Sequence, residues 1–375
     1  YEQDLQGQLF SETKILSKKD KEFLIKEFFL PFKQLDIKAG WNKLSNTFRA
    51  HYIEIIKDKV VVLSGEGQTI YFEKKNINEN KLDQKIIKNN IKDLASRNKF
   101  KFLGVRDILH DDNKLYISMI LENEKGHTIN IYVADFNLEY LEFKLFFQKN
   151  EYTKKYTIQT GGRLEKFKDN KILLSLGAAE SRKDKVQNMN FLEGKIITID
   201  KFTKEFEIVS LGHRNPQGLL FSNQNNLIIN SEHGPLGGDE INLNFILNNK
   251  EIKNFGWPIS SYGIEYDGTD PYKKSHKKFG FKEPFKNYSP SIGISEILFL
   301  PAEFNFMNGN NLIVSSLRAA SIYFIEISKD FKNILKEDRI FFSNQRIRDI
   351  TYDQDSNVIF IIFEVTPSIG ILRLN

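Results

Sequence analysis

The sequence predicts an all-β fold, a six-bladed β-propeller with a short N-terminal helical segment. Two observations predict the propeller. Six short runs of aliphatic and β-branched residues recur along the 375-residue chain, and each directly follows an Asn or Lys, as strands that leave tight turns do. Most runs are also separated by similar intervals, which indicates repeated units whose radial arrangement protects the sheet edges.

The six runs define the repeat. They are Val60–Leu63, Leu115–Ser118, Ile172–Ser175, Leu227–Asn230, Leu312–Ser315 and Val358–Ile361. Counted from Asp58 through the Asn before each later run, the steps are 55, 57, 56, 85 and 46 residues. A two-sheet sandwich is the alternative, but it gives no reason for six spaced units. The step of 85 predicts an insertion at about residues 241–290, which are rich in Asn, Lys, Gly and Pro.

A polar residue precedes each run, at 9–11 residues before five of them and 16 before the other. These residues are Arg49, Arg106 with Asp107, Arg163, Gln217, Glu296, and Arg348 with Asp349. In a propeller the first strand of each blade lines the central channel, so these groups are expected to converge on a ligand pocket. The alternative is that they only form hydrogen bonds to neighbouring blades.

Residues 1–45 do not follow the repeat and are expected to form an N-terminal extension to the propeller of residues 46–375. Ser17 followed by Asp20 has the pattern of a capping box. Leu24, Ile25, Phe28 and Phe29 then recur at helical spacing. We therefore predict a short amphipathic helix that packs on the propeller.

Charge and composition exclude several classes of protein. The 54 basic residues are scattered among 49 acidic ones, whereas a nucleic-acid binder concentrates its positive charge, so we expect no nucleic-acid partner. No apolar run approaches the roughly 18–20 residues of a membrane span. The absence of cysteine excludes disulfides and thiolate metal sites. The oligomeric state cannot be read from these features.

Two motifs carry most of the polar chemistry. The first is Gly212-His213-Arg214-Asn215-Pro216-Gln217-Gly218 and the second is Glu232-His233-Gly234-Pro235-Leu236-Gly237-Gly238-Asp239-Glu240. Arg214 can bind a carboxylate through two parallel hydrogen bonds. Carbonyl oxygens near Gly234 and Pro235, with the neighbouring carboxylates, are of the kind that calcium prefers, although an acidic pair in a loop is more often only surface.

These motifs, with Asn254-Phe255-Gly256-Trp257-Pro258, Gly161-Gly162-Arg163-Leu164 and Arg346-Ile347-Arg348-Asp349, resemble the glucose/sorbosone dehydrogenase family. The resemblance runs from about residue 100 to the end. It implies a six-bladed propeller that binds pyrroloquinoline quinone and calcium and oxidises a sugar or alcohol. It also implies a periplasmic or secreted protein.

The resemblance assigns roles to individual residues. Arg214, Asn215, Arg346 and Arg348 would contact the quinone, and Arg318 stands where the family has a cofactor-binding lysine. The backbone carbonyls of Gly234 and Pro235 would bind calcium. Guanidinium groups suit the three carboxylates of this cofactor, and the metal would polarise its reactive carbonyl.

The position of the catalytic base departs from the family pattern. Gln159 stands where the resemblance places a histidine that removes the hydroxyl proton of the substrate. An amide does not accept this proton, and loss of a general base costs on the order of a hundred- to ten-thousandfold in rate. His213 is a weak candidate for a substitute, since its role in the motif looks structural.

Two functions therefore remain open. The first is a quinone-dependent sugar dehydrogenase with altered or impaired catalysis. The second is a catalytically inactive propeller that binds a carbohydrate or a protein. The retained arginines favour the first and Gln159 favours the second.

Overall fold

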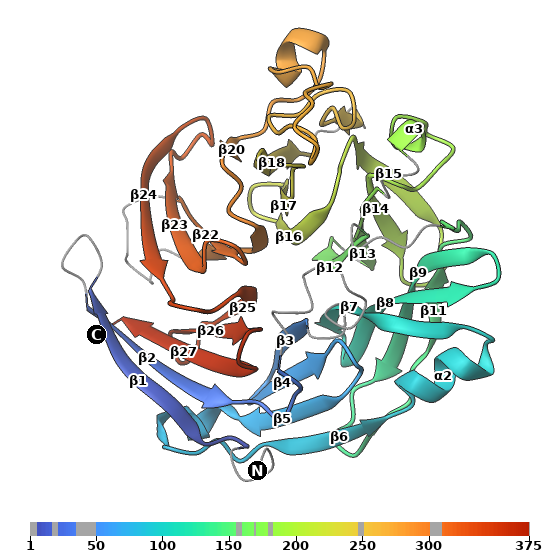
Figure 1. Ribbon diagram of the computed structural model, residues 1–375. Coiled ribbons are helices and arrows are strands. Elements are labelled where there is room, and N and C mark those ends of the chain that lie inside the picture. The colour runs from blue at the N-terminus through green and yellow to red at the C-terminus, as the bar shows by residue number, and fades with distance from the viewer. Residues whose placement is uncertain are drawn as a thin grey trace. The chain divides into compact units, whose positions relative to one another are not determined.

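The computed structural model describes residues 6–16, 22–34, 50–154, 160–168, 170–178, 183–246, 251–300 and 310–374. The chain divides into unit 1 (residues 1–90, 136–142 and 295–375) and unit 2 (residues 91–135 and 143–294). Within the described ranges the strands form six sheets of four or five strands, and the few helices are short (Figure 1). The predicted all-β, six-bladed β-propeller fold is confirmed.

Unit 1 contains three of these sheets. The first has the order β1 (Leu9–Leu16), β2 (Glu22–Phe29), β27 (Ser368–Leu374), β26 (Val358–Phe363) and β25 (Ile347–Asp353). The second has β10 (Tyr140–Leu141), β6 (Lys85–Asn89), β5 (Thr69–Glu73), β4 (Lys59–Ser64) and β3 (His51–Ile56), with the 3-10 helix η2 (Lys74–Asn78) between β5 and β6. The third has β21 (Ile294–Leu300), β22 (Asn310–Ser316), β23 (Ser321–Ile327) and β24 (Ile334–Phe341).

Unit 2 contains the other three. The first has the order β11 (Lys144–Gln148), β9 (Gly126–Asp135), β8 (Lys114–Asn123) and β7 (Lys101–Asp111). The second has β12 (Gly161–Phe167), β13 (Lys171–Leu176), β14 (Lys195–Asp200), β15 (Phe206–Leu211) and β19 (Lys253–Asn254). The third has β16 (Pro216–Ser222), β17 (Leu227–Glu232), β18 (Asp239–Phe245) and β20 (Lys286–Tyr288). The helices are α2 (Ile91–Arg97), α3 (Lys183–Val186) and the 3-10 helix η4 (His276–Phe279).

All six predicted runs lie in the second strand of a sheet, which confirms the repeat. These strands are β4, β8, β13, β17, β22 and β26, and every residue of the predicted runs in them is buried. Most of these buried residues are apolar because each strand packs against a neighbouring sheet of its own unit. One core cluster, for example, joins Leu173 of β13 to Ile228 of β17. Asn113, Asn170, Asn226 and Asn357 have φ between 47° and 62° in the preceding turns, where Asn is tolerated better than most residues.

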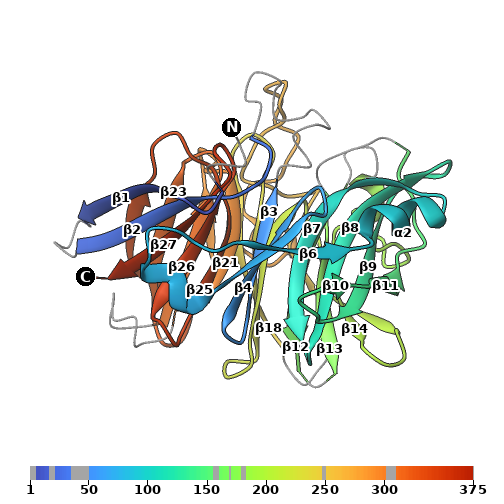
Figure 2. The same cartoon turned by 90° about the horizontal axis from the view of Figure 1, so that it is seen from below.

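The helix predicted over Leu24–Phe29 is wrong. These residues belong to β2, which pairs antiparallel with both β1 and β27. Figure 2 shows β1 and β2 beside β27 from a second direction. Phe23, Ile25 and Phe28 are the buried apolar residues of this strand, and Glu27 is buried with them. A short apolar run is compatible with both helical and strand spacing. Its pairing with β27 makes this segment a strand. The capping box at Ser17 and Asp20, and the predicted boundary at residue 45, lie outside the described residues.

Some of the polar first-strand residues connect adjacent sheets. Asp107 of β7 accepts the Leu164 amide of β12 at 2.6 Å, and Asp349 of β25 accepts the Ile53 amide of β3 at 2.9 Å. Both aspartates are buried. This is the second of the two predicted uses of these positions: the carboxylates hold neighbouring sheets together.

Candidate functional site

The first of the two sequence motifs, residues 212–218, begins in the segment between β15 and β16. Gly212 has φ of +81°, and a Cβ atom there would lie 2.4 Å from Asn254 Oδ1 and 2.5 Å from the Gly256 amide nitrogen. Only glycine permits this close approach. The approach places Phe255 and Trp257 beside the motif, since their amides donate to Leu211 and Gly212 at 2.8 and 3.1 Å.

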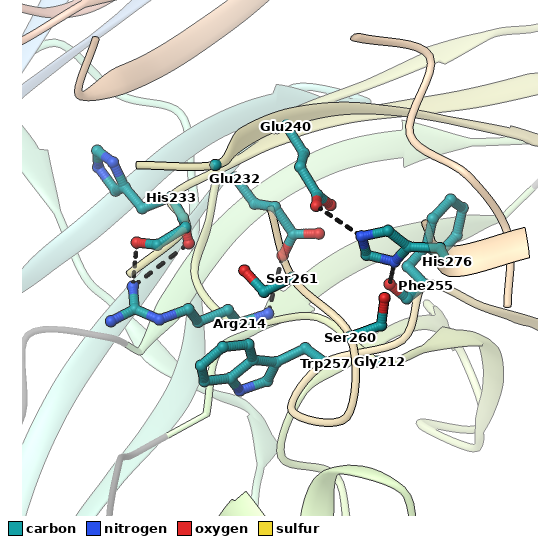
Figure 3. A pocket seen from close by; sticks show the side chains of 12 residues that line it. Gly212, Arg214, Glu232, His233, Glu240, Phe255, Trp257, Ser260, Ser261 and His276 are labelled. Carbon is teal, nitrogen blue, oxygen red and sulfur yellow. Dashed lines mark hydrogen bonds and ion pairs between the residues drawn. The ribbon is translucent and has the colours of Figure 1, made fainter. Parts of the chain in front are cut away.

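Arg214 points its guanidinium group at main-chain oxygens of the second motif. Its Nη1 atom donates to Gly234 O at 2.7 Å and to His233 O at 3.3 Å (Figure 3). The guanidinium carbon lies 5.2 Å from the Trp257 ring centroid and 5.9 Å from that of Tyr266. Carbonyl dipoles and aromatic faces therefore fix the position of the Arg214 guanidinium group.

Glu232 holds the segment between β15 and β16 in place through its side-chain carboxylate. Its Oε2 atom accepts the Arg214 amide at 2.8 Å, and its Oε1 atom lies 2.7 Å from Asn242 Nδ2 and 3.2 Å from His213 Nδ1. The carboxylate is buried, and every one of these partners is a hydrogen-bond donor. Glu232 thus orients the backbone that presents Arg214.

His213 is placed as a structural residue. It is fully buried, its Nδ1 faces Glu232, and its Nε2 lies 2.8 Å from Ser210 Oγ. The ring also packs against Phe255 at 5.0 Å. With both ring nitrogens engaged, this arrangement favours the structural role over that of a substitute base.

The second motif supplies carbonyl oxygens suited to a cation. Gly234 O already accepts from the Arg214 guanidinium, and the Gly234 amide donates to Asp239 Oδ1 at 3.2 Å. Pro235 is buried, and the Gly263 backbone packs against its ring. A metal ion at Gly234 O fits the chemistry of this carbonyl, but it would share or displace Arg214. Among the described residues, no three His, Cys, Asp or Glu side chains gather in a way that could hold a metal.

Asp239 stays ionised although it is fully buried. Burial works to raise the pKa of Asp239, but hydrogen bonds from His233 and Ser291 and from the Ile294 amide lower it below its usual value. The Ile294 amide lies 3.0 Å from Asp239 Oδ2. The carboxylate therefore braces the loop that carries Gly234.

A buried ion pair joins the insertion to the motif. His276 Nε2 lies 3.2 Å from Glu240 Oε1, and His276 Nδ1 lies 2.8 Å from Phe255 O. Burial raises the pKa of Glu240, which His276 opposes. Burial works to lower the pKa of His276, but Glu240 outweighs it and raises the pKa. The residues that line the small pocket at this place are Gly212, Arg214, Glu232, His233, Gly234, Gly238, Glu240, Phe255, Trp257, Ser260, Ser261 and His276.

Unit 1 holds two guanidinium groups that pair with one carboxylate. Arg346 Nε and Arg348 Nε lie 3.2 and 2.5 Å from the two oxygens of Glu364, which is buried. Burial works to raise the pKa of Glu364, but Arg348 and Arg346 outweigh it and hold the pKa below its usual range. Two cations therefore share one carboxylate.

The remaining predicted residues are less informative. Asn215 is buried, and its Oδ1 atom accepts the Gly161 amide at 3.3 Å and Gln217 Nε2 at 3.0 Å. Arg318 is exposed between β22 and β23. Gln159 lies outside the described residues.

Sequence reasoning missed the groups that support the arginines. Glu232 was visible in the motif but had no assigned role. Glu364 follows β26 and had no signal, because nothing in the pattern shows that it faces Arg346 and Arg348. His276 lies in the insertion, for which the repeat gave no template.

Comparisons with known proteins agree with this fold and these motifs. The sequence profile described as glucose/sorbosone dehydrogenase matches residues 81–368. The chain belongs to this family.

Two relatives show how far the similarity extends. An aldose sugar dehydrogenase of Escherichia coli (strain K12) is 29% identical over 210 residues, which is 52% of this chain and 54% of that protein. The quinoprotein glucose dehydrogenase B of Acinetobacter calcoaceticus is 26% identical over 216 residues, 43% of this chain and 44% of that protein. The chain therefore matches about half the length of these relatives.

Solved structures extend the likeness of the fold. The soluble aldose sugar dehydrogenase from Escherichia coli, in its apo-form, has a TM-score of 0.70 at 18% identity and covers 94% of this chain and 100% of its own. The PQQ-bound aldose sugar dehydrogenase from Streptomyces coelicolor has a TM-score of 0.63 at 17% identity and covers 94% and 98%. No helix in the described part of the chain is long and apolar enough to cross a membrane.

Proposed function

We propose that this protein binds pyrroloquinoline quinone and is a sugar dehydrogenase whose turnover is slow because Gln159 replaces the base. The observation that carries the proposal is the setting of Arg214. Its guanidinium group is buried, and main-chain carbonyls of the second motif fix its position. A site of this kind binds an anionic ligand without rearranging a carboxylate.

The residues contribute in distinct ways. Arg214 in unit 2, and Arg346 with Arg348 in unit 1, each offer guanidinium groups to carboxylates of the cofactor. When bound, the quinone supplies an electrophilic carbonyl that accepts a hydride from the sugar. Gln159 can orient the sugar hydroxyl through a hydrogen bond, but it cannot take its proton.

Calcium would bind the backbone carbonyl oxygens of Gly234 and Pro235. Arg214 already occupies the first of these oxygens, so the metal and the guanidinium group compete there. The substrate we propose is an aldose or a related alcohol, and the place of action is periplasmic or secreted, as in the family resemblance. Arg318 and Asn215 remain proposed cofactor contacts.

The test is calorimetric titration of pyrroloquinoline quinone into the purified protein, with and without calcium. Arg348→Lys and Arg214→Lys keep the charge but lose the two-pronged hydrogen bonding, so each is expected to weaken binding about tenfold. The matched controls are Arg339→Lys in unit 1 and Arg97→Lys in unit 2, both exposed, which should bind like the unaltered protein.

Catalysis is tested by Gln159→His. Restoring a base is expected to raise turnover of an aldose on the order of a hundred- to ten-thousandfold. No heat of binding in either condition would overturn the proposal. The arginines would then serve another ligand, and the protein would be a binding propeller for a carbohydrate or a protein, the alternative that Gln159 favours.

A further inference from the structure

Lys195 is a fully buried lysine that the proposed chemistry does not use. It begins β14, and its Nζ atom is surrounded by main-chain carbonyl oxygens. The distances are 2.6 Å to Val186 O, 3.0 Å to Asn188 O, 3.0 Å to Glu193 O and 3.2 Å to Lys185 O. Carbonyl oxygens converging on a single charge are the arrangement by which proteins bind hard metal cations.

The charges around Lys195 keep it protonated. Burial lowers the pKa of Lys195 to about 8, while Glu151 and Glu193 work to raise it and Lys149 works to lower it. Lys149 Nζ itself lies 3.7 Å from Glu151 Oε2, and Glu193 Oε1 accepts from Thr153 at 2.8 Å. At pH 7 the side chain is therefore an ammonium group that the carbonyls can bind.

The segment that supplies the carbonyls, residues 185–193, consists of the end of α3 and the loop after it, called loop 185–193 below, and it contacts the Arg214 site. Gln187 Nε2 donates to Trp257 O at 2.5 Å, and Gln187 Oε1 accepts from Asn254 at 2.7 Å. Val186 is in the same core cluster as Trp257. The Trp257 ring in turn lies 5.2 Å from the Arg214 guanidinium carbon.

Gly194 makes the contact between loop and motif close. Its φ is +68°, and a Cβ atom there would lie 2.4 Å from Val186 Cγ1 and 2.7 Å from His213 O. The His213 amide donates to Gly194 O at 3.1 Å. The residue directly before Lys195 is thus packed against the residue directly before Arg214.

We propose that the Lys195 ammonium group is a tethered structural cation that orders loop 185–193 and thereby positions Trp257 beside Arg214. Lys195 is a positioning residue, because it touches neither Arg214 nor a ligand and acts through Gln187 and Val186. The inference does not depend on which ligand the Arg214 site binds.

The test compares substitutions that separate charge from volume. Lys195→Met keeps most of the stem and removes the charge, whereas Lys195→Ala also opens space for propylammonium. Lys171→Met, in the adjacent strand β13, is the control, because the Lys171 side chain is partly exposed and pairs with the exposed Glu207. The readout is hydrogen exchange of the amides in residues 185–194 and 254–261, followed by mass spectrometry.

We expect exchange of both segments to rise roughly ten- to a hundredfold in Lys195→Met, under conditions where the rest of the protein stays protected. Lys171→Met should exchange like the unaltered protein. In Lys195→Ala, propylammonium chloride should restore protection, while propanol with matched sodium chloride should not.

Trp257 gives a second readout. The sequence contains one other tryptophan, Trp41, so a Trp41→Phe background isolates the emission of Trp257. We expect a red shift in Lys195→Met that propylammonium reverses in Lys195→Ala. If the Trp41→Phe protein does not fold, the exchange experiment alone decides.

Two results would overturn the proposal. In the first, Lys195→Met lowers the melting temperature but leaves exchange of residues 254–261 unchanged, so that the loop does not position Trp257. In the second, propanol restores protection as well as propylammonium, so that filled volume and not charge orders the loop. Hydrogen exchange and Trp257 emission are measured without quinone. A protein that does not bind quinone would therefore contradict the proposed function but not the proposed role of Lys195.

Discussion

Arg214 in unit 2 and Arg348 in unit 1 are both held at fixed positions, but by different partners. Arg214 rests on the carbonyls of His233 and Gly234, whereas Arg348 shares the buried carboxylate of Glu364 with Arg346. Carbonyl dipoles fix a cation and leave its charge in place. A buried carboxylate compensates the charge of a cation, so we expect a large loss of stability in unit 1 when Glu364 is neutralised.

The largest expected effect comes from removing that carboxylate charge. Glu364→Gln keeps the volume but removes the carboxylate charge that Arg346 and Arg348 share. We expect the free energy of unfolding to fall by about 3–5 kcal/mol. Urea denaturation measures it, with the exposed Glu205→Gln as a control that should change it by less than about 0.5 kcal/mol. If the free energy of unfolding falls by less than about 1 kcal/mol, Glu364 stabilises the fold no more than a surface ion pair does. The contrast between the unit 1 arginines and Arg214 would then be wrong.

The next effect is a pH dependence in unit 1. Burial, with a contribution from Arg348, lowers the pKa of His51 from 6.5 to about 4, although Glu364 opposes this. The unfolded chain therefore binds more protons than the folded protein as the pH falls from 6.5 to 4, so stability is lost across that window. His51→Phe should remove up to about 3 kcal/mol of this acid loss. Denaturation at pH 7 and pH 4 tests it, and an equal acid loss in both proteins would contradict it.

A smaller effect is expected at Glu232, whose carboxylate accepts the backbone amide of Arg214. Glu232→Gln replaces one acceptor oxygen with a donor that must face His213, Asn242 or the Arg214 amide. We expect a loss of about 2 kcal/mol, measured by thermal unfolding. A loss as large as that of Glu364→Gln would mean that the two regions depend on their carboxylates equally.

The smallest effect is expected at Arg318. This residue is exposed, so Arg318→Ala should change the free energy of unfolding by less than about 0.5 kcal/mol. Any effect of this variant would then appear only in ligand affinity, which calorimetry measures separately. A stability loss above about 1 kcal/mol would show that Arg318 supports the fold.

The sequence predicted the fold well where local and tertiary signals agree. The second strands are mostly apolar because they pack against neighbouring sheets of their own unit, and Asn113, Asn170, Asn226 and Asn357 in the turns before them have positive φ. It failed at Leu24–Phe29, where eight residues of β2 satisfy two periodicities and the partner strand lies at the far end of the chain. Contacts between distant segments leave no periodic trace.

The site was predictable only in part for the same reason. Arg214 and Gly234 lie in motifs that can be read directly, and the structure brings the two residues together. Glu364, His276 and Lys195 carry no such signal, because burial and facing partners decide what each of them does. Nothing in the sequence distinguishes Lys195, whose ammonium group is surrounded by carbonyl oxygens, from an exposed lysine.

The pairing of β2 with β27 has a consequence for synthesis of the chain. Glu27 and Ser368 form a hydrogen bond across 341 residues, so the sheet that contains the first strands is completed last. While the ribosome is still making the later sheets, β2 can pair with β1 but lacks β27, so part of the apolar surface of Phe23, Ile25 and Phe28 stays exposed. Contacts over such separations are slow to form, and unpaired apolar strands aggregate. The newborn chain is therefore most vulnerable in the interval before residues 368–374 emerge, when a chaperone that shields β2 would have its greatest effect on yield.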